Sequence, residues 1–119
     1  MEKLVFIVDD NDANLTLAAS ILETEYRVFT MPSAAKMFTL FEKFKPDLIL
    51  LDIEMPEMNG LEAMEILKKN PKWNEIPCLF LTGWSDEKIQ DKIKNSGANG
   101  IIFKPITAPA LMDYVKKYI

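Results

Sequence analysis

Hydrophobic residues follow two alternating patterns along the chain. Short, unbroken apolar runs are typical of strands buried on both faces, whereas apolar residues three or four positions apart are typical of helices with one buried face. The unbroken runs predict five strands, over residues 4–8, 26–30, 48–52, 76–82 and 101–103. The spaced pattern predicts five helices, over residues 12–23, 33–44, 61–69, 86–95 and from about 107 onward.

Cap and turn residues are consistent with these helix boundaries. Ser33 is of the type that caps a helix, Pro71 cannot continue the third helix, and Gly97 suits the end of the fourth. The fourth helix has a narrow apolar stripe, Ile89 and Ile93, so we expect it to be the least firmly docked. In the third helix, the spacing predicts a buried face made of Ala63, Met64, Ile66 and Leu67.

The alternation of strands and helices predicts the fold class. Because no long linker, repeat or low-complexity segment interrupts it, we expect one domain over residues 1–119. Successive strand–helix–strand units have right-handed crossovers, which gives a doubly wound α/β fold with helices on both faces of a parallel sheet. In such sheets the carboxyl ends of the strands lie along one edge, where these folds bind ligands.

Composition and charge narrow the function classes. The chain has 119 residues, of which 49% are hydrophobic and 27% charged, as in an ordinary globular protein. Its net charge of −4 and isoelectric point of about 4.8 argue against nucleic-acid binding. The apolar run over residues 4–8 is too short for a signal peptide or a membrane helix. We therefore expect a cytoplasmic protein that has no membrane partner.

The chain contains no histidine and a single cysteine, which excludes several kinds of chemistry. Cys78 lies in an apolar run and is expected in the core, so neither a disulfide framework nor a thiolate metal site is available. Without histidine there is no Ser-His-Asp or Cys-His catalytic group and no histidine-ligated zinc. Any chemistry therefore depends on carboxylates, hydroxyls, amines or a hard metal ion.

Polar side chains follow four of the predicted strands and are expected together at one edge of the sheet: Asp9, Asp10, Asp52, Thr82 and Lys104. Two carboxylates about 4 Å apart repel by roughly 4 kcal/mol at an effective dielectric constant of about 20, so three together require a cation. Oxygen ligands favour a hard divalent ion, first of all Mg²⁺. An ammonium and a hydroxyl beside a metal-bound carboxylate are the groups needed to place a phosphoryl group on that carboxylate.

The segments around these residues resemble the receiver domain of two-component response regulators over essentially the whole chain. The matching segments are residues 8–10 (VDD), 50–60 (LLDIEMPEMNG), 81–83 (LTG), 97–100 (GANG) and 104–105 (KP). The resemblance is specific because their order, spacing and strand-end positions all agree. It implies a flavodoxin-like (CheY-like) five-stranded parallel sheet of strand order 2-1-3-4-5 with five helices.

The same resemblance implies roles for the acidic residues. Asp52 would accept a phosphoryl group from a phosphohistidine on a sensor histidine kinase or a histidine phosphotransfer protein. Mg²⁺, or Mn²⁺ in its place, would be bound by Asp10, Asp52 and the main-chain carbonyl of Glu54, with Asp9 assisting. Self-phosphorylation from small donors and autodephosphorylation would accompany this regulatory role, in place of turnover of a substrate.

The remaining site residues also have implied roles. Thr82 would follow the new phosphoryl oxygens and Lys104 would pair with them, and the peptide bond from Lys104 to Pro105 would be cis. Receivers usually carry Tyr or Phe three residues before this lysine as part of a switch. Here that position is Ile101, with Phe103 directly before the lysine. We therefore expect phosphorylation without the usual aromatic switch.

Two further expectations concern the surface after the fourth strand. The bulk of Trp84, two residues past Thr82, would slow the loss of the phosphoryl group. The output surface is expected on the fourth helix, the last strand and the last helix, and a phosphorylation-dependent homodimer through residues 86–118 would use it. Because the sequence ends one helix after Lys104, we expect either a stand-alone receiver or a domain of a longer protein, acting on a protein target and not on DNA directly.

Three other functions share parts of this pattern. A flavodoxin-type FMN binder would need a phosphate loop rich in Ser, Thr and Gly at residues 9–12, where this chain has DDND. A phosphatase of the haloacid dehalogenase type would need an Asp-x-Asp nucleophile motif after the first strand, and the chain lacks it there. An interaction module that keeps the fold without the chemistry is disfavoured by the complete set of polar residues, although Ile101 keeps it open.

Overall fold

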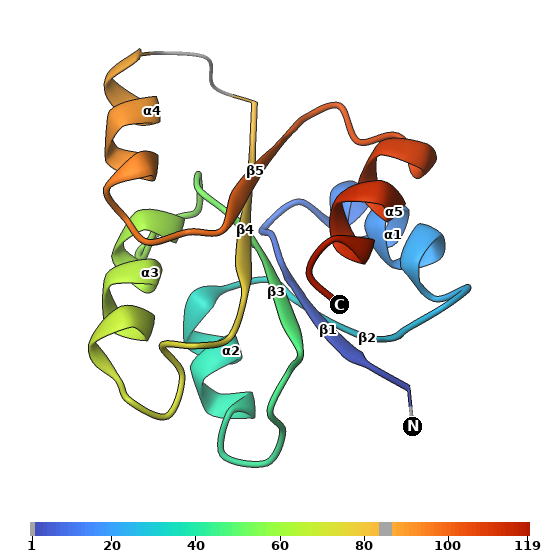
Figure 1. The fold of residues 1–119 in the computed structure, drawn as a ribbon, viewed down its shortest axis with the longest axis horizontal. Coiled ribbons are helices and arrows are strands. Elements are labelled where there is room, and N and C mark those ends of the chain that lie inside the picture. Colours follow the sequence, from blue (N-terminus) through green and yellow to red (C-terminus); the bar gives the residue numbers. More distant parts are fainter. Residues whose placement is uncertain (1, 84–86) are drawn as a thin grey trace.

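The structure is a computed structural model that describes residues 2–83 and 87–119. Its centre is a parallel sheet of order β2-β1-β3-β4-β5 (Figure 1), which confirms the predicted fold class and strand order. The strands are β1 (Leu4–Val8), β2 (Arg27–Met31), β3 (Leu48–Asp52), β4 (Cys78–Thr82) and β5 (Gly100–Phe103).

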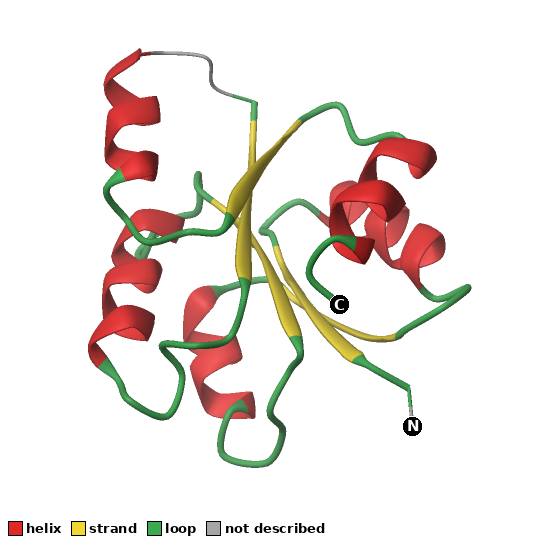
Figure 2. Ribbon diagram, viewed as in Figure 1, coloured by secondary structure: helices red, strands yellow, loops and turns green. Residues whose placement is uncertain are grey.

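Helices cover both faces of this sheet (Figures 1 and 2). One layer contains α1 and α5, and the other contains α2, α3 and α4. Within the described ranges, no helix has the length and apolar character needed to cross a bilayer. The bounds are α1 (Asp12–Leu22), α2 (Ala34–Leu40), α3 (Gly60–Lys69), α4 (Glu87–Lys94) and α5 (Ala108–Lys116).

The unbroken apolar runs form strands because both faces of the sheet are buried. In β1, Phe6 and Val8 join the cluster under α2, α3 and α4, whereas Val5 and Ile7 join the cluster under α1 and α5. All five residues of β1, β3 and β4 are buried. Cys78 is buried as expected. The alternation of side chains therefore assigns the apolar residues of these three strands to one of two cores.

Some predicted boundaries were wrong. β4 begins at Cys78 and not at residue 76, because Pro77 has no N–H to donate to the ladder. α2 ends at Leu40 and not at residue 44, since the N–H of Lys43 bonds to the carbonyl of Leu40 in a tighter turn. In α3, Ile66 lies at the flank of the buried face and is 39% exposed, so its predicted burial was wrong.

The first residue of α3 packs against the end of β3. The N–H of Gly60 donates to the carbonyl of Ile53 at 2.9 Å, and Asn59 and Glu62 cap the helix through a reciprocal capping box. A Cβ atom on Gly60 would lie 2.9 Å from the Cα of Ile53 and closer still to the carbonyl oxygen of Asp52. Glycine at this position therefore lets the helix start directly beside the backbone of Asp52.

We predict that Gly60→Ala lowers the free energy of unfolding by about 2–3 kcal/mol, because the new methyl group meets backbone atoms that cannot rotate away. The matched control is Gly83→Ala, where an added Cβ meets no atom within 4 Å and the change should stay below about 0.5 kcal/mol. Urea unfolding followed by circular dichroism measures both. Equal losses in the two variants would contradict the steric argument.

Candidate functional site

The side-chain alternation of the strands determines which polar residues meet at the carboxyl edge. Asp9, Asp52 and Lys104 each lie two positions after a residue of the core under α1 and α5, namely Ile7, Leu50 and Ile102. They continue the same alternation and project toward the same side of the sheet. Residues from β1, β3 and the end of β5 are thereby brought together, as the sequence predicted.

Lys104 bridges two buried carboxylates. Its Nζ lies 3.1 Å from Asp9 Oδ2 and 3.2 Å from Asp52 Oδ1, and the two aspartates are 1% and 3% exposed. The backbone N–H of Lys104 donates to the carbonyl of Thr82 at 2.9 Å, which fixes the lysine to the end of β4. The peptide bond from Lys104 to Pro105 is cis, as the resemblance implied.

Asp10 completes an acidic cluster with Asp9 and Asp52. Asp10 is exposed, and one carboxylate oxygen from each residue lies within 4.8 Å of the others. Because three carboxylates face one ammonium group, the cluster keeps two negative charges. Oxygen ligands in this number fit a hard divalent cation, so the donor set agrees with the predicted Mg²⁺ or Mn²⁺.

The two carboxylate oxygens of Asp9 have different surroundings, and those of Oδ2 suit a cation. Its Oδ1 accepts a hydrogen bond from the backbone N–H of Asn11 at 2.9 Å. Its Oδ2 is buried and accepts no hydrogen bond from any described residue, since the contact with Lys104 is an ion pair that lacks hydrogen-bond geometry. A buried carboxylate oxygen is costly unless its lone pairs are satisfied, and the ion pair with Lys104 leaves this atom able to bind a second positive partner.

Burial is the largest influence on the pKa of Asp52. It raises the pKa of the Asp52 carboxyl from 3.8 to about 6, and the neighbouring charge of Asp9 acts in the same direction, while Lys104 opposes both. Burial alone would lower the pKa of the Lys104 ammonium, but the carboxylates of Asp52 and Asp9 outweigh it, so this pKa is raised. The lysine therefore stays charged, and the Asp52 anion is held at a cost.

Thr82 ends β4 at the same edge but belongs to the other face of the sheet. It is 1% exposed and lies two residues after Phe80, which packs in the core under α2, α3 and α4. In the β4–β5 register Thr82 lies opposite Phe103, which is 50% exposed. Ile101 is partly buried and packs against the same core. Thr82 thus connects the acidic edge with the α4 side of the molecule.

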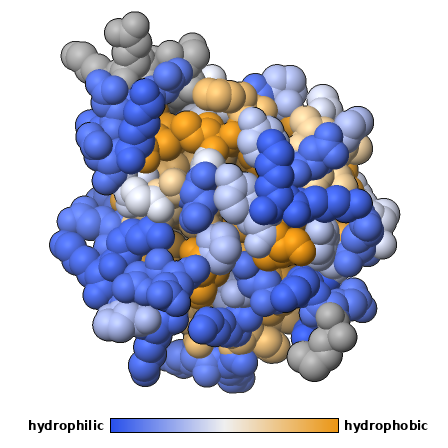
Figure 3. All heavy atoms as spheres, viewed as in Figure 1, coloured by the Kyte–Doolittle hydropathy of each residue, from blue (hydrophilic) through white to orange (hydrophobic). Residues whose placement is uncertain are grey.

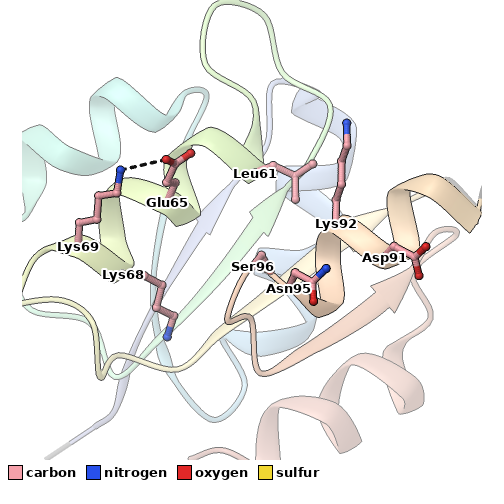
Figure 4. A pocket seen from close by; sticks show the side chains of 8 residues that line it. All are labelled: Leu61, Glu65, Lys68, Lys69, Asp91, Lys92, Asn95 and Ser96. Carbon is pink, nitrogen blue, oxygen red and sulfur yellow. Dashed lines mark hydrogen bonds and ion pairs between the residues drawn. The ribbon is translucent and has the colours of Figure 1, made fainter.

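A hollow of about 540 Å³ opens beside the acidic cluster. Asp10 and Glu54 both line it. Leu61 and Lys92 also line it and are shared with a groove of about 550 Å³ between α3 and α4 (Figure 4). The space in front of the carboxylates therefore continues along the inner side of α4.

Charged groups in the α3–α4 groove do not converge on one point. Figure 4 shows the side chains of Lys68 and Lys92 directed away from each other, and Lys69 Nζ pairs with Glu65 at 3.0 Å. Lys68 Nζ donates to the carbonyl of Asn74 at 3.0 Å. The groove thus separates two helices without forming a specific site for a charged ligand.

Sequence reasoning gave Asp9 a smaller part than the structure does. We expected Asp9 to assist in binding the metal ion; the structure adds that Asp9 is buried and is an ion-pair partner of Lys104. The alternation of β1 does not distinguish Asp9 from Asp10, because both faces of this strand are buried. The expectation for Trp84 concerns a residue outside the described ranges.

Comparison with known proteins agrees with this geometry. A family model described as the response regulator receiver domain matches residues 5–116. The polar-differentiation response regulator DivK of Brucella ovis is 32% identical over 120 aligned residues, which cover 100% of this chain and 98% of that protein. An acidic cluster such as that of Asp9, Asp10 and Asp52 is typical of the phosphoacceptor site of receivers.

Solved structures give the same result. The receiver domain of a signal transduction histidine kinase from Syntrophus aciditrophicus is 30% identical with a TM-score of 0.90, covering 98% of this chain and 89% of that one. The chemotaxis protein CheY4 of Vibrio cholerae has a TM-score of 0.93 with both chains fully covered, and at 23% identity it shows likeness of fold.

We predict that Asp52→Asn stabilises the protein at pH 7.5 by about 3 kcal/mol in the presence of a chelator, since each tenfold change in proton affinity corresponds to about 1.4 kcal/mol. The pKa of Asp52 is about 6 when folded and 3.8 normally, so the folded state binds more protons between these values. Stability of the parent protein therefore falls as pH rises from about 4 to 6, and the gain should vanish near pH 4.

Chemical denaturation at both pH values measures this difference. Asp91→Asn, which changes an exposed carboxylate on α4, is the control and should change stability little at either pH. A loss of stability in Asp52→Asn at pH 7.5 would show that the Asp52 anion is stabilising and would contradict the electrostatic argument.

Proposed function

This chain belongs to the response regulator receiver family of two-component signalling, and we propose that Asp52 accepts a phosphoryl group from a phosphohistidine on a sensor histidine kinase or histidine phosphotransfer protein. The observation that carries this proposal is the contact of Lys104 Nζ with both Asp52 and Asp9 inside a cluster of three acids. The sequence contains no histidine, so the donor imidazole comes from another molecule.

The proposed transfer uses groups of this chain on both sides of the phosphoryl group. An oxygen of Asp52 attacks phosphorus and forms an O–P bond as the P–N bond breaks, and the leaving imidazole keeps the electron pair and takes a proton from water. The ammonium of Lys104 and the hydroxyl of Thr82 bind the phosphoryl oxygens as their charge develops. The same attack on a small donor such as acetyl phosphate releases acetate.

A divalent cation belongs to this proposal. Asp9, Asp10, Asp52 and the main-chain carbonyl of Glu54 would hold Mg²⁺, or Mn²⁺ in its place. When bound, the ion offsets the negative charge of the carboxylates and of the incoming phosphoryl group. The excess of carboxylates over ammonium groups in the cluster, and the buried Oδ2 of Asp9, which accepts no hydrogen bond from the described residues, support this assignment.

Phosphorylation of Asp52 would change the partners of Lys104 and Thr82. The lysine would exchange a carboxylate oxygen for phosphoryl oxygens, and the threonine would turn toward the same oxygens. Because Thr82 lies opposite the half-exposed Phe103, its movement would alter the surface formed by β5, α4 and α5. At position 101 this chain has a partly buried isoleucine, so the change at Thr82 would reach this surface without the usual aromatic switch.

The helix α4 is suited to carry this change. Ile93 is buried and Ile89 partly buried, while the other described side chains of the helix are polar. The α3–α4 groove separates α4 from α3. Figure 3 shows hydrophobic atoms beside the hydrophilic surface over α4, at the upper left. Few apolar contacts make a small rearrangement inexpensive. The homodimer through residues 86–118 and the cytoplasmic location stay predictions, and residue 86 lies outside the described ranges.

We predict that incubation with Mg²⁺ and acetyl phosphate adds one phosphoryl group, measured by intact-protein mass spectrometry. Asp52→Asn and an excess of chelator should each abolish the addition, whereas the control Asp91→Asn should be modified like the parent protein. Lys104→Gln should be modified at least tenfold more slowly, because a charge-assisted contact with the phosphoryl oxygens is lost. A phosphoryl group on Asp52→Asn would place the acceptor elsewhere.

We further predict that backbone amides in residues 89–94 of α4 exchange with solvent about ten- to a hundredfold faster than those in residues 63–69 of α3, because α4 has fewer buried apolar contacts. Hydrogen exchange followed by NMR measures both helices in one sample, so α3 is the internal control. Equal protection of the two helices would exclude weak docking of α4 as the basis of the output.

A further inference from the structure

A small hollow lies at the edge of the sheet opposite the carboxylates. It has a volume of about 340 Å³, and we call it the aromatic pocket. It is formed by the turn after α2 and the loop after α3, and both reach the end of the sheet where β3 and β4 begin (Figure 1). The lining residues are Phe41, Phe44, Lys45, Lys72 and Trp73.

Ring contacts hold the aromatic walls in place. The centroids of Phe41 and Trp73 are 4.8 Å apart, and Phe41 stacks at 5.8 Å on Phe6, which is fully buried in β1. Phe44 contacts Phe29 edge-on at 4.8 Å. Aromatic pairs in these arrangements are favourable beyond their buried area. The walls therefore exist before any ligand arrives, which lowers the cost of binding.

All charged groups at the aromatic pocket are positive. Lys45 and Lys72 are exposed, and neither forms an ion pair with a residue in the described ranges. The guanidinium of Arg27 lies 5.7 Å from the centroid of Phe44 and adds a third positive charge. No acidic residue lines the hollow, although the whole chain has a net charge of −4.

The pocket also offers a hydrogen-bond donor. Within the described part of the chain, no residue accepts a hydrogen bond from the indole N–H of Trp73. An indole nitrogen can only donate, as can the two ammonium groups. Aromatic walls combined with donors and positive charges select a flat apolar body that carries an anionic acceptor.

We propose that the aromatic pocket binds a small aromatic acid, with one or two fused rings and a carboxylate. The rings would pack against Phe41, Phe44 and Trp73, and the carboxylate would pair with Lys45 and Lys72. The volume lies near the lower end of the range for ligand sites, which suits a molecule of this size. The α3–α4 groove is lined by charges of both signs and therefore does not fit an anionic ligand in the same way. The proposal does not depend on phosphorylation of Asp52.

The test is an NMR titration of the ¹⁵N-labelled protein with 2-naphthoate, and with 2-naphthamide as the neutral ligand of the same shape. The indole N–H cross-peak of Trp73, assigned by its loss in Trp73→Phe, should shift and saturate with 2-naphthoate at concentrations up to several millimolar. The amide should bind about five- to tenfold more weakly, as expected when two exposed ion pairs of 0.2–1 kcal/mol each are lost.

Two double variants with the same change in net charge complete the experiment. Lys45→Gln with Lys72→Gln should weaken binding of 2-naphthoate about five- to tenfold, and both positions are exposed, so the fold should be kept. Lys3→Gln with Lys36→Gln removes two exposed lysines outside the pocket and should leave the affinity unchanged. Equal affinities for acid and amide, equal weakening in both variants, or no shift of the Trp73 cross-peak would each overturn the proposal.

Discussion

The ion pairs between one ammonium group and two buried carboxylates are the constraint on which this edge of the sheet depends. Lys104 reaches Asp52 and Asp9 from the far side of β4, so its position requires β3, β4 and β5 to be paired in the observed order and register. Two buried anions without a cation would cost several kcal/mol. The ion pairs that offset the burial cost of the two carboxylates also place a positive charge where an incoming phosphoryl group would need it.

Most of the fold could be predicted because the strongest signals are local. The bounds of β1 were correct, since a strand buried on both faces is an unbroken apolar run. The end of α2 was wrong because Phe41 and Phe44 continue the helical spacing, yet ring contacts with other elements hold them in a turn. The spacing of apolar residues indicates which side chains are buried, but it does not determine the backbone conformation at those residues.

The sequence was enough to predict which residues form the candidate site, but not which of them are buried and which are exposed. Strand ends of a parallel sheet converge, which is enough to bring Asp9, Asp10, Asp52, Thr82 and Lys104 together. The separation into a buried, lysine-bound Asp9 and an exposed Asp10 depends on where β1 ends, because one residue reverses the face. The position of Phe103 opposite Thr82 depends likewise on the register between β4 and β5, and no local sequence pattern determines that register.

The close approach of Gly60 to the backbone of Asp52 has a mechanical consequence. The end of β3 and the start of α3 are joined by the hydrogen bond from Gly60 to Ile53 and by close backbone contact, which makes this connection stiff. If α4 is weakly docked, as we predict, a displacement at Asp52 would be resisted on the α3 side and taken up across the groove, at α4. The absence of a single methyl group at position 60 would thus favour one direction for such a displacement.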